Sequence, residues 1–345
     1  MINNFGGAAK ALEALPELSR RGGGRRAIRI CPRDEAENEL ARARKISAEP
    51  VFTIEPGYPG ALAALDTPPP LIYIKGRPEL LNRPALAIVG SRESSAAGMK
   101  LARHFSHAIG EAGYVIVSGL ARGIDGAAHE AALNSGTVAV LAGGIDNIYP
   151  PEHEKLQARI SVEGCLVSEQ PPGFNPRAQD FPRRNRIVSG MSLGVVIVEA
   201  AARSGTLVTA RFASEQGREV FAVPGHPLDP RAEGTNRLIK SGATLVTEPA
   251  DILDALRPLS GLSEIAAPLS RPPDMTVPFE QPAPDVGDGE RNRILSVLGP
   301  APTDLDAIIR ATGLSIRAVQ IGLMELELAG RLSRPGPGLI ALQMD

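Results

Sequence analysis

The chain has 345 residues, of which 43% are hydrophobic and 22% are charged, and its formal net charge at pH 7 is -2. This length suits two or three domains with buried cores, and the composition is that of a globular protein. The near-neutral charge excludes a general electrostatic attraction to nucleic acid, so a nucleic-acid site would need basic residues that are gathered locally.

Cysteine use and hydropathy exclude further classes of protein. Cys31 and Cys165 are far apart and form no CxxC, so a disulfide framework and a zinc ribbon are both disfavoured. No apolar run reaches membrane-spanning length and no cleavable leader pattern is found, so we expect a cytoplasmic protein without membrane insertion. Aromatic residues are only 3% and tryptophan is absent. Phosphate contacts, more than base stacking, should therefore supply the affinity of any nucleic-acid site.

The beginning of the chain predicts a small helical domain, which we place at residues 1–50. Ala8–Leu18 has a helical apolar pattern, and Gly22–Gly24 ends it. Three prolines at 68–70 then lead into Leu71–Ile74, which reads as a strand that joins the next domain.

Seven short apolar runs alternate with helical stretches in the next domain, which we place at residues 51–257. Runs rich in Val, Ile, Leu and Ala are typical of strands covered on both faces, and helical crossovers give parallel pairing. We therefore expect an α/β fold with a Rossmann-like, doubly wound and mainly parallel sheet. The runs are Ala85–Val89, Tyr114–Val117, Thr137–Leu141, Cys165–Ser168, Gly194–Val198, Glu219–Val223 and Ala243–Val246.

Residues 258–289 contain seven prolines and little periodicity, which predicts a semi-extended linker. Residues 290–345 then predict a winged helix-turn-helix domain, because three helical patterns precede a Gly/Pro hairpin at Pro335–Gly338. Thr303 and Ser315 are the expected N-caps. The helical patterns are Arg291–Leu298, Asp304–Ala311 and Ser315–Leu328.

Four of the predicted strands open directly into glycine turns. In an open α/β sheet the carboxyl ends of the strands line one crevice, where ligands bind. Glycine lets a phosphate approach the backbone, and the following helix N-terminus supplies amide donors. We therefore predict an anion-binding rim. The alternative for any single turn is that its glycine only allows the chain to change direction. The rim residues are Gly90, Ser91 and Arg92; Ser118, Gly119 and Arg122; Gly143 and Gly144; and Ser204, Gly205 and Thr206.

The usual signatures of nucleotide cofactors and metals are not found. The turn Gly90–Gly98 lacks the G-x-G-x-x-G spacing, and no G-x-x-x-x-G-K-[ST] segment occurs. We expect no cofactor, no metal and no catalytic residue. An enzyme would need Glu199 or Asp125 as its acid, and we expect each of them to cap a turn or to pair with an arginine instead.

Basic residues cluster in the second half of this domain. Arg183, Arg184 and Arg186 lie within four residues, and the stretch from Arg177 to Lys240 has ten Arg or Lys against six Asp or Glu. Arginine forks match phosphate oxygens, and Asn185 can add a neutral hydrogen bond. The alternative is a solvated helix face, or internal ion pairs with Glu199 and Asp180.

Seven segments between about Phe52 and Val246 carry a specific combination of residues, order and spacing: Gly90–Arg92, Ser118–His129, Gly143–His153, Ser168–Glu169, Phe181–Ile187, Glu199–Ala210 and Val223–Gly225. Together they resemble the DprA family of DNA-processing proteins, also called Smf. The resemblance implies a dimeric Rossmann-like domain that binds and protects single-stranded DNA and loads a RecA-type recombinase during DNA uptake, natural transformation and recombination.

The same resemblance points to individual residues and to the terminal domains. It implies that Arg92, Lys155, Arg184, Asn185 and Arg186 contact DNA, with the glycine turns as a close backbone rim. It also implies a helical domain of the SAM or helix-hairpin-helix kind at residues 1–50, present here in part. The winged helix has six basic and six acidic residues, so it suits a protein partner as well as DNA.

Two other functions stay open. A nucleotide-processing enzyme of the phosphoribohydrolase-like group would carry P-G-G-x-G-T-x-x-E, whereas Ala202–Thr209 has neither paired glycines nor the glutamate. A transcription regulator would use Ser315–Leu328, with Arg317 and Gln320 placed to meet bases. The two glutamates later in that helix and the lack of a basic flank disfavour this reading.

Overall fold

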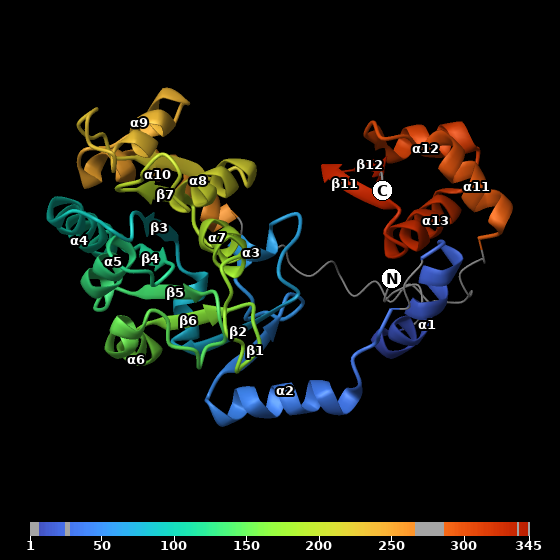
Figure 1. Ribbon diagram of the computed structural model, residues 1–345, viewed down its shortest axis with the longest axis horizontal. Coiled ribbons are helices and arrows are strands. Elements are labelled where there is room, and N and C mark those ends of the chain that lie inside the picture. The colour runs from blue at the N-terminus through green and yellow to red at the C-terminus, as the bar shows by residue number, and fades with distance from the viewer. Residues whose placement is uncertain (1–6, 25–27, 266–285, 337, 344–345) are drawn as a thin grey trace. The chain divides into compact units, whose positions relative to one another are not determined.

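The computed structural model describes residues 7–24, 28–265, 286–336 and 338–343. The chain divides into two compact units. The central unit is Ala36–Arg271, and the terminal unit combines Met1–Glu35 with Pro272–Asp345. In Figure 1 the terminal unit therefore contains both ends of the colour scale, the blue N-terminal helix and the red C-terminal elements.

The central unit is built on a nine-stranded sheet. In spatial order its strands are β1 (Glu49–Phe52), β2 (Leu71–Gly76), β6 (Cys165–Ser168), β5 (Thr137–Leu141), β4 (Val115–Ser118), β3 (Ala85–Val89), β7 (Gly194–Ile197), β8 (Glu219–Ala222) and β9 (Thr244–Leu245). The pairs from β6 to β9 are parallel, whereas β1 and β2 form an antiparallel extension. Each predicted apolar run overlaps a strand, so the mainly parallel sheet is confirmed.

Helices cover both faces of this sheet (Figure 1), and the alternation along each strand decides which face a side chain joins. In β3, Ala87 and Val89 pack on the side of α3 (Gly60–Ala63), α7 (Asp180–Gly190) and α8 (Thr206–Glu215). Leu86 and Ile88 pack on the opposite side, with α4 (Ala96–Glu111), α5 (Ile124–Ala132) and α10 (Pro249–Ile265). Strands β3 to β7 are buried at every residue, which explains their continuous apolar sequence.

Five further elements complete the central unit. They are α2 (Arg33–Lys45), which begins in the terminal unit, η2 (Pro78–Asn82), η3 (Pro151–His153) with α6 (Glu154–Glu163), and α9 (Glu233–Lys240). Helix α6 packs on the face that α5 also covers, through Leu156 and Ile160. Helix α10 continues through Pro258 to Ile265, whereas the sequence led us to begin a linker at Pro258. Residues 266–285 of that linker lie outside the described residues.

The terminal unit contains the predicted winged helix. Its elements are α11 (Asp288–Val297), β10 (Thr303–Asp304), α12 (Leu305–Thr312), α13 (Ile316–Leu328), β11 (Leu332–Gly336) and β12 (Leu339–Leu342). Ser315 caps α13 as predicted, accepting a bond from the amide of Ala318. The cap of α12 is Asp304 and not Thr303, because the Asp304 carboxylate reaches the Ala307 amide at 2.7 Å.

Helix α1 (Ala8–Arg21) packs against α13 in this unit. Gly22 has φ -70°, which any residue can adopt, but a Cβ at this position would lie 2.0 Å from the carbonyl oxygen of Glu325. The hydroxyl of Ser19 donates to the carbonyl of Leu328 at 3.4 Å. Gly22 therefore serves the close approach of the two backbones and not a special backbone conformation.

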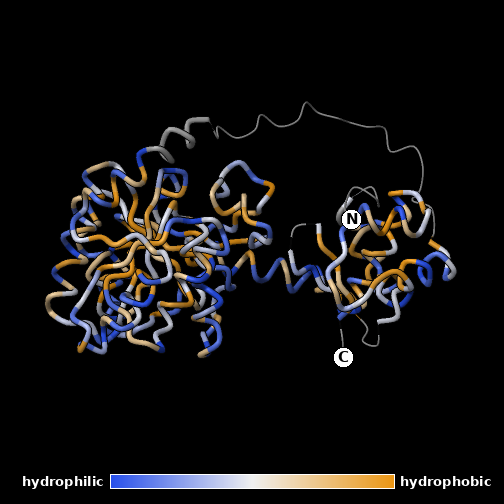
Figure 2. The backbone as a smooth tube through the Cα atoms, turned by 90° about the horizontal axis from the view of Figure 1, so that it is seen from above, coloured by the Kyte–Doolittle hydropathy of each residue, from blue (hydrophilic) through white to orange (hydrophobic). Residues whose placement is uncertain are grey.

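Figure 2 shows the hydrophobic residues in orange along the strands of the sheet and inside the winged helix. Within the described residues no single helix is long and apolar enough to cross a membrane, although α12 and α13 taken together, across a bend of 113°, meet that length and composition.

Candidate functional site

A groove of about 690 Å³ lies at the carboxyl ends of the parallel strands. It is lined by the turns that follow β3, β4 and β7 and by the facing sides of α7 and α8. The structure thus brings together glycine turns that are far apart in the sequence, as the doubly wound topology requires. The predicted site residues that line the groove are Gly90, Ser91, Arg92, Gly119, Arg184, Asn185, Ser204, Gly205 and Thr206.

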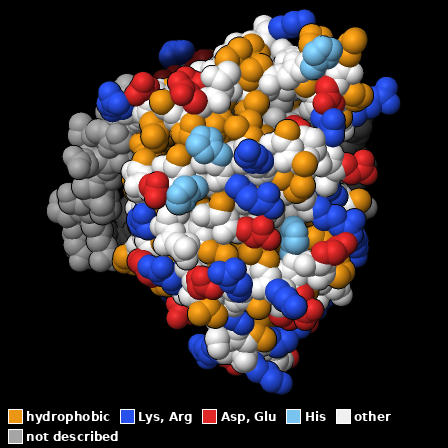
Figure 3. Space-filling model, turned by 90° about the vertical axis from the view of Figure 1, so that its left-hand side faces the viewer, with side chains coloured by type: hydrophobic (Ala, Val, Ile, Leu, Met, Phe, Trp, Pro, Cys, Tyr) orange, Lys and Arg blue, Asp and Glu red, His pale blue; other side chains and the backbone are white. Residues whose placement is uncertain are grey.

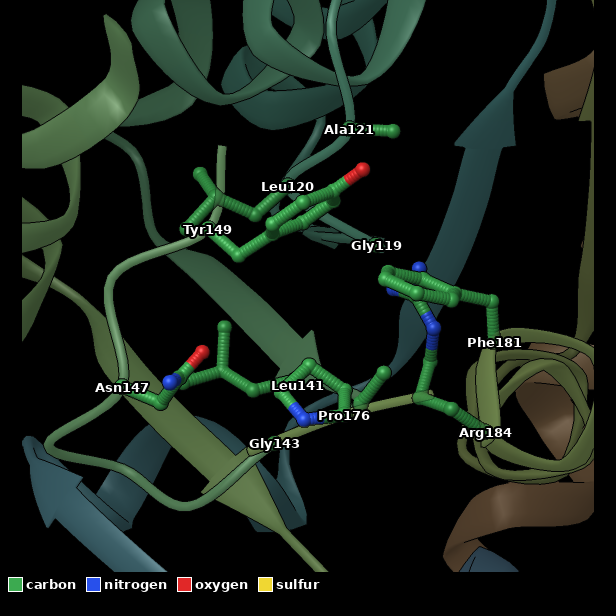
Figure 4. A pocket seen from close by; sticks show the side chains of 11 residues that line it. Gly119, Leu120, Ala121, Leu141, Gly143, Asn147, Tyr149, Pro176, Phe181 and Arg184 are labelled. Atoms are coloured by element: carbon green, nitrogen blue, oxygen red, sulfur yellow. The ribbon is translucent and has the colours of Figure 1, made fainter. Parts of the chain in front are cut away.

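A smaller pocket adjoins this groove, with room for about one water molecule. Figure 4 shows Gly119 and Gly143 on its walls, with Tyr149 and Phe181 on opposite sides and the Arg184 side chain below Phe181. The turn that carries Gly143 is tied to the next loop, because the Gly144 amide donates to the carbonyl of Phe174 at 3.0 Å. Gly143 therefore borders this pocket, whereas Gly144 uses its amide within the fold.

An aromatic pair and an arginine stand at the mouth of the groove. The rings of Tyr149 and Phe181 are 5.0 Å apart and inclined by 53°, and the guanidinium of Arg92 lies over Phe181. Tyr149 keeps 44% of its surface exposed. From the sequence we expected phosphate contacts to dominate, and neither ring was among the predicted site residues. Their signal was present, since each ring lies in a segment that carried the family resemblance.

Arg184 differs from the expectation that it offers its fork to DNA. Its side chain is 6% exposed, and Nη1 donates to the carbonyl oxygen of Val140 at 2.7 Å. The guanidinium lies directly against Gly119, where a Cβ would be 1.9 Å from Nη1. Burial lowers the pKa of Arg184 to about 10, and Asp125 opposes that shift. Arg184 therefore remains a cation at neutral pH and mainly supports the turn after β4.

Other predicted cations are neutralised by ion pairs. Arg186 and Arg183 both pair with Glu169, and Arg122 pairs with Glu152 at 2.6 Å. Internal ion pairs were the alternative reading of this basic cluster, but the partner is Glu169 and not Glu199 or Asp180. Within the described residues no ion pair is recorded for Arg92, which leaves its charge available to a ligand.

The remaining predicted residues occupy the framework or the surface beyond the groove. Ser118 is fully buried and its hydroxyl donates to the carbonyl of Ile88 at 2.7 Å, so it cannot form part of an open rim. Asn185 lines the groove and its Nδ2 donates to the carbonyl of Gly205 at 3.4 Å. Lys155 is exposed on α6 and lies outside the groove lining.

The two candidate acids are engaged in turns, as expected. Asp125 accepts bonds from the amides of Gly119 and Ala121 at 3.1 and 3.3 Å. Burial raises the pKa of Asp125, while Arg184 and the amide donors oppose the rise. Glu199 accepts from the amide of Ser95 at 2.9 Å and from its hydroxyl at 2.5 Å. Both carboxyl groups therefore stabilise turns around the groove.

The surface formed by α4 and α5 differs from the groove in its charge. There the blue Lys and Arg side chains alternate with red Asp and Glu side chains (Figure 3), and Arg103 pairs with Glu130 at 3.6 Å. Interspersed charges of both signs give little attraction to a polyanion. The groove, and not this face, is therefore the candidate site for an anionic ligand.

Comparison with protein families gives three matches along the chain. Residues 49–257 match the family described as DNA recombination-mediator protein A, residues 278–336 match the DprA winged helix domain, and residues 1–42 match the DprA-like N-terminal HHH domain. The N-terminal match includes α1, the central match covers the nine-stranded sheet, and the C-terminal match covers most of the winged helix.

Individual relatives agree with these matches. The chain is 40% identical over 321 residues to protein Smf of Escherichia coli (strain K12), covering 90% of this chain and 82% of that protein. It is 44% identical over 207 residues to the DNA processing protein DprA of Streptococcus pneumoniae, covering 59% and 73%.

Two solved structures are similar to the central part of the chain. The X-ray structure of DprA from Streptococcus pneumoniae has a TM-score of 0.60 at 40% identity and covers 63% of this chain and 77% of that one. The structure of DNA processing protein A from Helicobacter pylori, described for its single-stranded DNA binding mode, has a TM-score of 0.56 at 30% identity, covering 61% and 96%.

Proposed function

This chain belongs to the DprA family of DNA-processing proteins, and we propose that it binds single-stranded DNA in the groove of its central unit, protects the strand and loads a RecA-type recombinase onto it. The observation that carries the proposal is the groove itself. It combines the available charge of Arg92, the Tyr149–Phe181 ring pair and the amino end of α8.

These three features match the parts of a single strand. A guanidinium and the amides at a helix N-terminus attract phosphates, while aromatic faces stack on bases without reading their edges. Stacking requires unpaired bases, so the combination favours a single strand over a duplex. The related protein from Helicobacter pylori is described as binding single-stranded DNA, which supports the same ligand here.

We further propose that the groove binds without catalysing a reaction, in the cytoplasm, during uptake and recombination of DNA. Asp125 and Glu199 each accept hydrogen bonds from backbone amides of nearby turns, so neither stands free in the groove as a general acid or base. The nucleotide-processing alternative would need one of these groups to be released.

Dimerisation is part of the proposal, because two short strand-binding grooves joined in one assembly hold a long strand more tightly than either alone. Strand β9 is an edge of the sheet, and its Leu245 is 48% exposed. Ile54, beside the opposite edge strand β1, is 93% exposed. Light scattering of Leu245→Arg and Ile54→Arg shows which edge of the sheet lies in the dimer interface. The variant with the substitution in that interface should be a monomer, and the other variant should remain a dimer.

A gel shift at two salt concentrations tests the main proposal. The full chain and a variant ending at Ile265, the last residue of α10, should bind an unstructured single strand with similar affinity and bind the matching duplex much less. Preference for a duplex sequence would instead support a transcription regulator. Nucleotide hydrolysis without single-strand binding would support the enzyme. Loss of single-strand binding on removal of the winged helix would move the site out of the groove.

A further inference from the structure

The turns at the carboxyl edge of a doubly wound sheet are the usual holders of a nucleotide phosphate, because free amides there converge on the ligand. In this protein two of these turns already hold a carboxyl group of the chain itself. We call Asp125 and Glu199 the resident carboxyls.

The first resident carboxyl fills the turn after β4. Oδ2 of Asp125 accepts from the amides of Gly119 and Ala121, and the residue is 5% exposed. The buried guanidinium of Arg184 lies against the same turn, and its Nε has no hydrogen-bond partner among the described residues. Donated amides beside a buried cation form the environment that a phosphate requires, and here a side chain occupies it.

The second resident carboxyl fills the amino end of α4, the helix that follows the first parallel strand. Glu199, two residues after the end of β7, accepts from the amide and hydroxyl of Ser95. Ser95 in turn caps the helix by accepting from the amide of Gly98 at 2.9 Å. A Cβ at Gly98 would lie 2.5 Å from Cδ of Glu199. The carboxyl group therefore rests on the helix terminus, where dinucleotide cofactors place their pyrophosphate.

The turn after β7 is different. The amide of Thr206 bonds only the nearby Ser204 hydroxyl, at 3.2 Å, and a Cβ at Gly205 would meet nothing within 4 Å. Among the described residues, no carboxyl group forms a hydrogen bond with this turn. The backbone of this turn is thus open to the groove, which Arg92 also lines.

We propose that the resident carboxyls are specificity-determining groups that keep inorganic phosphate and free nucleotides out of the turns after β3 and β4, leaving the open turn at Ser204–Thr206 for the backbone of a polymer strand. The proposal rests on the proposed function, because it states which half of the groove the strand uses. It adds that side chains of the protein itself occupy the position where this fold typically binds a nucleotide phosphate.

The experiment removes one resident carboxyl group by substitution and adds inorganic phosphate to the solution. Asp125→Ala removes the carboxyl group and leaves two amides beside Arg184. Melting temperatures are measured in inorganic phosphate and in chloride at equal ionic strength. Phosphate should raise the melting temperature of Asp125→Ala by several degrees more than chloride does, because a ligand bound only by the folded state stabilises it. The wild-type chain should show only the smaller difference that comes from the general stabilising effect of phosphate and from the open groove.

Asp251→Ala is the matched control. Asp251 also accepts from two backbone amides, those of Thr247 and Glu248, but it does so on an exposed surface. Its removal should leave the response to phosphate equal to that of the wild-type chain. If Asp125→Ala responds to phosphate no more than Asp251→Ala does, the proposal is overturned. If Asp125→Ala does not fold even in phosphate, Glu199→Ala, which empties the less buried second turn, decides by the same comparison.

Single-strand binding by the wild-type chain is measured in parallel and reports on the proposed function alone. A wild-type chain that binds the strand, together with variants that ignore phosphate, removes the inference and leaves the proposed function standing. If the variants are stabilised by phosphate but the wild-type chain binds no single strand, the exclusion of phosphate by the resident carboxyls stands and the proposed function is removed.

Discussion

The guanidinium of Arg92 lies 5.1 Å from the centre of the Phe181 ring, which joins the turn after β3 to the first turn of α7. The contact holds a cation and an aromatic face together at the groove. It also gives the site its sharpest tests, because Arg211 makes the same kind of contact with Phe212 on α8, at 5.3 Å, outside the groove lining.

Arg92→Ala should weaken single-strand binding and reduce the steepness of log affinity against log salt by about 0.7, the value for one lost phosphate contact. The measurement is a binding titration at several salt concentrations. Arg211→Ala and Arg317→Ala remove one positive charge each and should have much smaller effects, since neither side chain lines the groove. Equal losses in all three variants would indicate a general charge effect and would refute a phosphate contact at Arg92.

Phe181→Ala should weaken binding of a base-containing strand by about 1–3 kcal/mol, the range found for a base stacked on an aromatic ring. An abasic strand of equal length should lose much less, because it keeps its phosphates and has no base to stack. Phe212→Ala serves as the control for removing a ring beside an arginine. The stacking assignment fails if Phe181→Ala affects both strands alike.

Arg184→Met should lower the free energy of unfolding by at least about 2 kcal/mol, since the variant loses a buried charged hydrogen bond to the carbonyl of Val140. Urea denaturation measures the change. Arg203→Ala, at an exposed position in the turn after β7, should leave the unfolding free energy nearly unchanged. A fully stable Arg184→Met with reduced DNA affinity would instead make Arg184 a direct phosphate ligand.

His129 should make the fold sensitive to acid. Burial, with His153 and Arg184 nearby, lowers the pKa of His129 from 6.5 to about 3. Between these values the unfolded chain binds a proton that the folded chain does not, so stability falls as the pH falls from 6.5 towards 3. In His129→Asn the loss of unfolding free energy between pH 7 and 4.5 should be smaller by about 2 kcal/mol.

The control for this titration is His107→Asn, which removes an exposed histidine paired with Glu111. It should retain the acid sensitivity of the wild-type chain. An unchanged pH dependence in His129→Asn would mean that other groups govern the acid response.

Gly22→Ala should loosen α1 from α13, because the new Cβ would lie 2.0 Å from the Glu325 carbonyl oxygen. Overpacking of this kind destabilises by about 1–3 kcal/mol. Limited proteolysis should then cut within residues 7–24 earlier than in the wild-type chain. Gly289→Ala, on α11 with nothing within 4 Å of its Cβ position, should resist as the wild type does. Equal resistance of the two variants would contradict a close packing of α1 on α13.

The local pattern of the sequence was sufficient for the architecture. The strands β3 to β7 are buried on both faces, so their apolar runs stand out from the helices between them, and the period of the winged helix is equally clear. Strand β1 was missed because Glu49–Phe52 is a partly exposed edge strand whose sequence, EPVF, has no such pattern. The family was also within reach of the sequence, since its motifs are short and continuous.

The tertiary structure alone decided which of the motif residues face a ligand. Arg184 and Arg186 are two residues apart on one helix, yet the first is buried against Val140 and Gly119 and the second pairs with Glu169. Tyr149 and Phe181 become neighbours only because the loop that carries Tyr149 meets the first turn of α7 beside the groove. Hydrophobic periodicity is a property of adjacent residues and can be read along the chain, whereas burial of a charge and the choice of its partner depend on groups that folding brings from distant segments.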